Sequence, residues 1–258
     1  MSAPLLVVRD LSVSYGERRV SFVPELTVGP GECVAIVGES GSGKTSALLA
    51  LLGLQPGARV TGSVDMFGSA DVLADQFRLA PFLGSRVALV SQSPISALNP
   101  TMRLGRFAVL ALRKHGRTRD LAREQLTDAL GAVSLVPDIL HRYPHQVSGG
   151  QAQRFSIALA LALGVELIVA DEPTSALDVT VQAEIVELLA SLRRDRGMGL
   201  LIVSHDIALV SGLADHIIVM KDGEVVETGP TAQVIGTPST EYARALIDAV
   251  PQLGGSFS

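Results

Sequence analysis

Short apolar segments alternate with stretches of helical periodicity along most of the chain. Residues 33–37, 166–170 and 200–203 are almost wholly apolar. Such runs are typical of strands buried on both faces of a parallel sheet, although a buried helix can give the same pattern. Between the last two runs, one helical face carries Val181, Ile185, Leu188, Leu189 and Leu192. Strands that alternate with helices predict an α/β fold.

The middle of the chain has a different pattern. Helical signals dominate from about residue 93 to residue 163, with Leu126, Leu130 and Val133 on one stripe. An Ala/Leu-rich segment begins at Ile157. The pattern predicts a helical subdomain inserted into an α/β core. One domain over 1–258 is therefore expected, with a core of 1–92 and 164–236, a helical subdomain of 93–163 and a C-terminal helix and tail of 237–258.

Composition narrows the class of protein. The mean hydropathy is high at +0.37, yet no run reaches the ~18 apolar residues that a membrane-spanning helix needs. The net charge of −5 argues against a general nucleic-acid binder, because neutralising phosphates requires a basic face. Cys33 is the single cysteine, which excludes an internal disulfide and fits a reducing compartment.

The first candidate site is the segment 38–45, Gly-Glu-Ser-Gly-Ser-Gly-Lys-Thr, which matches G-x-x-x-x-G-K-[ST]. Its glycines let backbone N–H groups point at an anion, and the following helix adds its positive end. We expect Lys44 to reach the β- and γ-phosphates of a nucleotide and Thr45 to bind Mg²⁺. A simple glycine-rich turn is the alternative, which the strand before the segment and the helix after it disfavour. The predicted nucleotide-binding residues here are Gly38, Ser40, Gly41, Ser42, Gly43, Lys44, Thr45 and Ser46.

An acidic pair follows the apolar run that ends at residue 170. Ligands collect at the carboxyl ends of parallel strands, so Asp171 is expected near Lys44, where it would hold Mg²⁺. Glu172 is positioned to act as general base toward a water that attacks the γ-phosphate. By itself the pair is equally consistent with a solvated strand end. The predicted nucleotide loop nearby is what favours a catalytic role for it.

A second glycine-containing segment, Ser148-Gly149-Gly150-Gln151, lies between the nucleotide loop and the acidic pair. Here the chain resembles the ABC superfamily of ATPases, whose signature is L-S-G-G-Q, with Val147 in place of the leucine. The resemblance implies a P-loop NTPase core with a parallel sheet, an N-terminal antiparallel β part and an inserted helical subdomain. It also implies that this segment faces the γ-phosphate of an ATP held by an opposite subunit. Two ATP molecules would then lie between two such subunits.

The resemblance extends to four single residues in the family's order. Tyr15 is similar to the aromatic that stacks on adenine, and Gln92 to the glutamine that senses Mg²⁺ and the attacking water. Asp178, in Ser-Ala-Leu-Asp, resembles the loop that crosses the dimer, and His205 resembles the histidine that contacts the γ-phosphate. The implied catalytic set is Glu172, His205, Gln92 and Lys44, and the implied Mg²⁺ ligands are Thr45, Gln92 and Asp171.

Three longer stretches, 91–100, 171–182 and 237–251, resemble the importer ATPases for oligopeptides, dipeptides and nickel. The last stretch departs from their pattern, because Thr237 or Ser239 stands where the family has histidine. Many members continue into a cysteine-bearing extension that in some holds an iron–sulfur cluster. The chain lacks those cysteines, so we expect no cluster.

The resemblance implies an ATPase that uses ATP and Mg²⁺ to power peptide import at the cytoplasmic face of the cell membrane. Expected partners are two membrane permease subunits, a second related ATPase and, indirectly, an extracytoplasmic solute-binding protein. A heterodimer is expected, with a homodimer as the alternative, and no nucleic-acid partner. The rival functions are import of nickel or another metal chelate, and a soluble regulatory or repair ABC ATPase.

Overall fold

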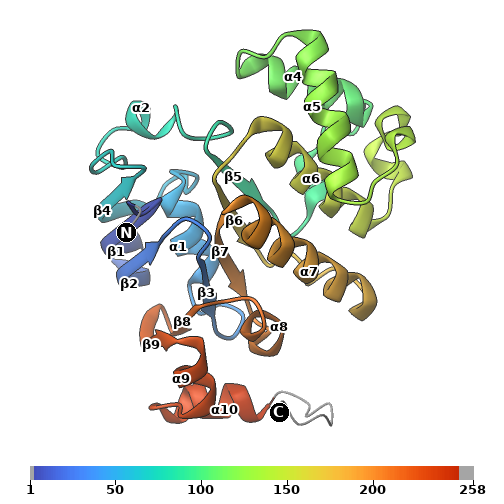
Figure 1. Ribbon diagram of the computed structural model, residues 1–258. Coiled ribbons are helices and arrows are strands. Elements are labelled where there is room, and N and C mark those ends of the chain that lie inside the picture. The colour runs from blue at the N-terminus through green and yellow to red at the C-terminus, as the bar shows by residue number, and fades with distance from the viewer. Residues whose placement is uncertain (1–2, 250–258) are drawn as a thin grey trace.

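The computed structural model describes residues 3–249, and a mixed sheet of nine strands runs through it (Figure 1). Its parallel part consists of β5 (Val87–Val90), β6 (Leu167–Asp171), β7 (Gly199–Ser204), β3 (Cys33–Val37) and β8 (His216–Lys221), in that spatial order. Every residue of β3, β6 and β7 is buried. The three apolar runs are therefore strands covered on both faces, and the α/β prediction is confirmed.

The other part of the sheet contains the antiparallel strands β1 (Leu6–Tyr15), β2 (Arg18–Val28) and β4 (Arg59–Met66). β1 pairs with both β2 and β4. β9 (Glu224–Pro230) joins the two parts, because it pairs antiparallel with β8 and parallel with β2. The chain thus has the expected N-terminal antiparallel portion, fused to the parallel strands in one continuous sheet.

Apolar layers cover the two faces of this sheet, and strand β3 contributes to both. Val34 and Ile36 pack on one side with α1 (Lys44–Leu51). Cys33, Ala35 and Val37 pack on the other side with α7 (Val179–Arg196) and α6 (Gly149–Leu163). This alternation is the period-2 pattern of a strand between two layers. The predicted helical face is confirmed in α7, where Ile185, Leu188, Leu189 and Leu192 are buried and Val181 is half-buried.

Helices occupy the described chain from residue 94 to residue 163, and none of those residues lies in a strand. They are α3 (Pro94–Ala97), α4 (Leu104–Lys114), α5 (Arg119–Ala132), two short 3₁₀ turns (Pro137–His141 and Pro144–Gln146), and α6. Figure 1 shows α4 and α5 beyond the edge of the sheet, with α6 between them and the strands. Leu126, Leu130 and Val133 are buried as their stripe predicts. The exact subdomain boundaries stay a prediction.

The remaining helices are short: α2 (Gln76–Leu79), α8 (Ile207–Ser211), α9 (Thr231–Gly236) and α10 (Glu241–Asp248). The expected C-terminal helix corresponds to α10, and Pro251 lies outside the described residues. Within residues 3–249, no helix combines the length and apolarity needed to cross a membrane.

Candidate nucleotide-binding and hydrolysis site

The phosphate-binding loop connects β3 to α1, and two of its glycines leave no room for a side chain. Gly38 has φ +153° and Gly43 has φ +94°, both in the range that disfavours other residues. A Cβ atom on Gly38 would lie 2.1 Å from the carbonyl oxygen of Met220, and one on Gly43 would lie 2.4 Å from that of Val20. The β8–β9 and β1–β2 regions therefore pack closely against this loop and restrict its backbone conformation.

Lys44 is the first residue of α1, and its side chain folds back over the loop. The Nζ atom donates to the carbonyl oxygens of Gly38 (2.8 Å) and Glu39 (2.7 Å) and lies 3.3 Å from Ser42 Oγ. Only 4% of the residue is exposed. Desolvation lowers the pKa of Lys44, and the nearby carboxylates of Glu172, Asp171 and Glu39 oppose this effect. The loop thus holds a pre-positioned cation.

Asp171 at the end of β6 faces this helix start. The hydroxyl of Thr45 donates to Asp171 Oδ1 at 2.9 Å. Burial raises the pKa of Asp171, with only partial relief from the Thr45 hydrogen bond. Hydroxyl and carboxylate oxygens are the ligands that Mg²⁺ prefers, and a desolvated carboxylate is one that a cation stabilises. The donor set therefore fits Mg²⁺.

Glu172 follows in a backbone conformation unusual for its residue type, with φ +48°. Its amide donates to the Val203 carbonyl at 2.9 Å, and its carboxylate is in hydrogen-bond contact with His205 Nδ1. Gln92 Nε2 donates to Ser175 Oγ at 3.1 Å, and that hydroxyl donates to the Glu172 carbonyl at 3.2 Å. The structure thereby links Gln92, Glu172 and His205, which lie far apart in the sequence.

A cavity of about 530 Å³ opens over Lys44, Gln92 and Glu172, whereas Asp171 and His205 are not among its described lining residues. Eight predicted residues line it: Ser40, Gly41, Gly43, Lys44, Thr45, Ser46, Gln92 and Glu172. Five lining residues were not predicted: Arg18, Arg19, Val20, Asp222 and Gly223. The two arginines lie just after Tyr15, so the available sequence signal was a basic pair beside the predicted adenine-stacking residue. Arg19 forms an ion pair with Glu224, and Arg18 adds positive charge to the field that an anionic ligand meets there.

The Ser148 segment begins helix α6 and is not part of this cavity in the described chain. Ser148 Oγ accepts from the Gln151 amide at 3.2 Å, and Gln151 Oε1 accepts from the Ser148 amide at 3.1 Å. This reciprocal pair is a capping box. Cβ atoms on Gly149 and Gly150 would meet Leu177 at 3.1 Å and Val181 at 2.6 Å. The segment therefore packs on the loop that carries Asp178, which itself caps α7 through the Val181 amide.

Two tyrosines lie at the margins of the site. Tyr15 is 41% exposed, donates to Gln55 Oε1 at 2.9 Å, and does not line the cavity as described. Tyr242, on α10, was missed by sequence reasoning. Its hydroxyl accepts from the Glu39 amide at 3.1 Å, and Lys221 Nζ lies 4.8 Å from its ring centroid. Helix α10 is thereby tied to the phosphate-binding loop.

Comparison with known proteins identifies the family of the chain. The model of the ABC transporter family matches residues 23–175. The chain is 42% identical to a putative peptide import ATP-binding protein of Brucella melitensis, over 98% of this chain and 79% of the relative. It is 40% identical to the dipeptide transport ATP-binding protein DppD of Escherichia coli, over 96% of this chain and 79% of the relative.

Solved structures give the same result for the fold. An ATP-binding cassette in a dimeric, post-hydrolysis state with ADP and phosphate superposes with a TM-score of 0.76 at 28% identity. That match covers 88% of this chain and 98% of the other. A Clostridium perfringens protein from the cbiONQ transporter complex superposes with a TM-score of 0.80 at 23% identity, over 97% of both chains.

These matches establish the family and its basic activity, which is the binding and hydrolysis of ATP. The family predicted from the sequence motifs is confirmed. The chain belongs to the ABC transporter family, as an ATPase of the peptide-importer subfamily.

Proposed function

We propose that the chain drives the import of dipeptides or oligopeptides across the cytoplasmic membrane by hydrolysing ATP at the cavity beside Lys44. The observation that carries this proposal is the convergence of Lys44, Thr45, Asp171, Glu172 and His205 at the carboxyl ends of β3, β6 and β7. A phosphate cradle, a carboxylate for a cation and a base with its orienting partner are the parts that phosphoryl transfer to water needs.

In this proposal Lys44 and the N–H groups of the loop hold the β- and γ-phosphates. Glu172 accepts a proton from the attacking water, while the bond between the γ-phosphorus and the bridging oxygen breaks and ADP leaves. His205 orients the Glu172 carboxylate, to which it is bonded in the structure. Thr45, Gln92 and Asp171 would hold Mg²⁺, which when bound neutralises charge on the phosphates. The hydrogen bonds through Ser175 connect Gln92 to this base.

The site is completed by a second subunit in this proposal. Ser148, Gly149, Gly150 and Gln151 contact the γ-phosphate of the ATP held by the partner, and Asp178 lies at the same interface. Tyr15 stacks on the adenine. The partner is a related ATPase, so the working unit is a heterodimer, with a homodimer as the alternative.

Peptide import further requires two membrane permease subunits and an extracytoplasmic solute-binding protein, with this chain on the cytoplasmic face of the membrane. The names of the curated relatives, which are peptide and dipeptide transport proteins, support this assignment. Import of nickel or another metal chelate is the second candidate, because the 91–100 and 171–182 stretches resemble both groups of importers. A soluble regulatory or repair ATPase is the rival of another class, and the net charge of −5 disfavours nucleic acid as its partner.

The test is to tag the chain in its native host, extract the membranes gently and identify the proteins that co-purify. Two permeases, a related ATPase and a solute-binding protein are expected, and the ligand of the binding protein then decides between peptide and metal chelate. Recovery from the soluble fraction alone, without an integral membrane partner, would overturn the transporter proposal.

A further inference from the structure

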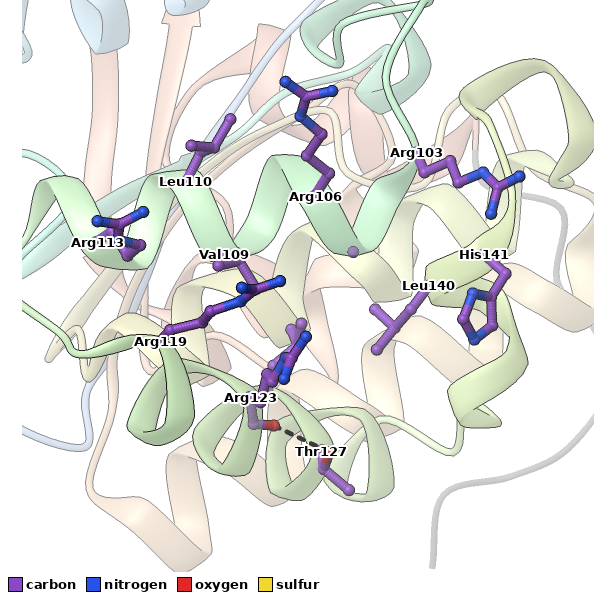
Figure 2. A pocket seen from close by; sticks show the side chains of 12 residues that line it. Arg103, Arg106, Val109, Leu110, Arg113, Arg119, Arg123, Thr127, Leu140 and His141 are labelled. Carbon is purple, nitrogen blue, oxygen red and sulfur yellow. Dashed lines mark hydrogen bonds between the residues drawn. The ribbon is translucent and has the colours of Figure 1, made fainter.

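A second cavity, of about 630 Å³, lies between α4 and α5 (Figure 2). We call it the basic pocket, because its lining includes Arg103, Arg106, Arg113, Arg119, Arg123 and His141. Figure 2 shows Arg119 and Arg123 reaching from α5 toward α4, with Arg103 and His141 together at the other end. It shares no lining residue with the nucleotide cavity.

The five arginines of the basic pocket form no ion pair within the part of the chain that the structure describes. Other arginines do, such as Arg86 with Glu166 and Arg193 with Asp215. The contrast is notable in a chain whose net charge is −5, where carboxylates outnumber cations. The exposed cations repel one another across a shared hollow, and an anion bound there would relieve that repulsion.

The arginines are placed by helical spacing. Arg106 and Arg113 lie seven residues apart on one face of α4, and Arg119 and Arg123 lie at i and i+4 on α5. Like charges at i, i+4 destabilise a helix slightly, and Asp120, three residues before Arg123 on α5, offsets part of that repulsion. Figure 2 shows the guanidinium groups of Arg119 and Arg123 between the two helices, and Arg106 and Arg113 border the same cavity from α4.

The floor of the basic pocket is apolar. Val109 and Leu110 from α4, Leu126 from α5, and Leu140 line it, and Leu110 is 46% exposed. Ligand sites of small molecules have this size and this mixture of apolar walls with a few charged groups. The lining therefore suits a ligand that has both anionic and apolar parts.

We propose that the basic pocket binds a phosphate-bearing ligand, either a soluble phosphorylated compound or the headgroup of an anionic phospholipid. A guanidinium fork matches two oxygens of one phosphate, and phosphate carries more charge than a single carboxylate. The forks of Arg119 and Arg123, with further arginines along the lining, match a phosphate better than the one carboxylate of an ordinary acidic side chain. The proposal goes beyond ATP hydrolysis and holds whether or not the chain works in a peptide importer.

The experiment measures equilibrium binding to the full chain with saturating Mg–ADP, so that the nucleotide site is filled. One probe is inorganic triphosphate. The others are vesicles of phosphatidylcholine alone and vesicles of phosphatidylcholine and phosphatidylglycerol in equal parts. The pocket variant is Arg106→Gln/Arg119→Gln/Arg123→Gln. Its matched control, Arg59→Gln/Arg78→Gln/Arg196→Gln, removes three exposed arginines elsewhere and the same net charge.

The expected result is that the pocket variant binds about 100-fold more weakly than the control, for the probe that the wild-type chain binds. Binding of triphosphate identifies a soluble ligand, and binding only of phosphatidylglycerol vesicles identifies a lipid headgroup. Equal losses in both variants, no binding of either phosphate probe, or binding of a polyglutamate peptide instead would overturn the proposal.

A second variant guards against misfolding. Arg106→Lys/Arg119→Lys/Arg123→Lys keeps the charge and the helix propensity but loses the planar fork, so its affinity should lie between those of the wild-type chain and the glutamine variant. An affinity equal to wild type would show that only net charge matters, and would contradict a site built for phosphate. Retained binding of Mg–ADP reports that each variant is folded.

Discussion

The nucleotide cavity and the basic pocket both gather positive charge, and they hold it in opposite ways. Lys44 is 4% exposed, with two carbonyl oxygens and a hydroxyl around its ammonium group. The arginines of the basic pocket are exposed and form no ion pair within residues 3–249. The first arrangement fixes a cation in place at the cost of desolvation, whereas the second leaves its cations hydrated and adaptable.

This difference shows which of the two sites holds its charged groups in fixed positions. Catalysis needs donors that are already oriented when charge develops, so the loop at Lys44 is constrained by neighbouring strands and by glycines in conformations that other residues rarely adopt. Capture of a charged ligand needs only a field and a hollow, and flexible arginines on two helices provide both. Substitutions in the phosphate-binding loop and beside it measure how far the constraint at the nucleotide site extends.

The largest expected effect on stability comes from Gly43→Ala in the phosphate-binding loop. The new Cβ would lie 2.4 Å from the Val20 carbonyl oxygen at φ +94°, so clash and backbone strain add. We expect a loss of about 3 kcal/mol in the free energy of unfolding, measured by urea denaturation, and a loss of ATP binding.

Gly41→Ala is the matched control for that variant. Its φ is +84°, yet no atom lies within 4 Å of the added Cβ. Backbone strain alone should then lower the free energy of unfolding by about 1 kcal/mol. Equal losses in the two variants would show that packing against β1–β2 does not constrain the loop.

A smaller effect of opposite sign is expected for Asp171→Asn. Burial raises the pKa of Asp171, so the ionised carboxylate lowers the stability of the folded chain above that pKa. This cost disappears as the pH falls through the raised pKa. At neutral pH, without nucleotide or Mg²⁺, the variant should be more stable by about 1 kcal/mol, while its hydrolysis of ATP is lost.

Thermal and urea unfolding of both proteins over a pH series checks this prediction. The stability difference between Asp171→Asn and wild type should narrow toward acidic pH. Asp128→Asn, which changes an exposed carboxylate on α5, should differ from wild type by less than about 0.5 kcal/mol throughout. If Asp171→Asn were less stable than wild type at neutral pH, the expected cost of burying the ionised Asp171 carboxylate would be contradicted.

The smallest effect is expected for Tyr242→Phe, which removes the acceptor of the Glu39 amide. The free energy of unfolding should fall by about 1 kcal/mol or less. Hydrogen exchange at the Glu39 amide should become faster, because this N–H loses its protein partner. An unchanged exchange rate would mean that α10 does not steady the phosphate-binding loop.

The sequence predicts best those strands that are completely buried. Strands β3, β6 and β7 are buried on both faces, so their composition alone marks them. Strands β4 and β9 are half-exposed and largely polar, so no apolar run reveals them. Local sequence carries little information about a strand whose stability comes from pairing with distant partners.

The residues of the nucleotide site also fall into those that a local sequence pattern reveals and those that only the fold brings together. The glycine loop is readable because its chemistry requires a fixed local order of residues. Arg19 on β2, Asp222 in the turn between β8 and β9, and Tyr242 on α10 reach the nucleotide cavity or its loop. Their positions depend on how β1, β2, β8 and β9 join the sheet, which spacing along the chain does not show. The basic pocket likewise appears only when α4 and α5 pack side by side.

We assign Glu172 as the base of the hydrolytic site, and ATP hydrolysis by Glu172→Gln in the assembled transporter tests this role directly. Glutamine keeps the size of the side chain but accepts a proton poorly, so turnover should fall about 10²- to 10⁴-fold while ATP binding is retained. Glu124→Gln, an exposed change on α5, should leave hydrolysis unchanged. Hydrolysis by Glu172→Gln at the wild-type rate would contradict the assignment.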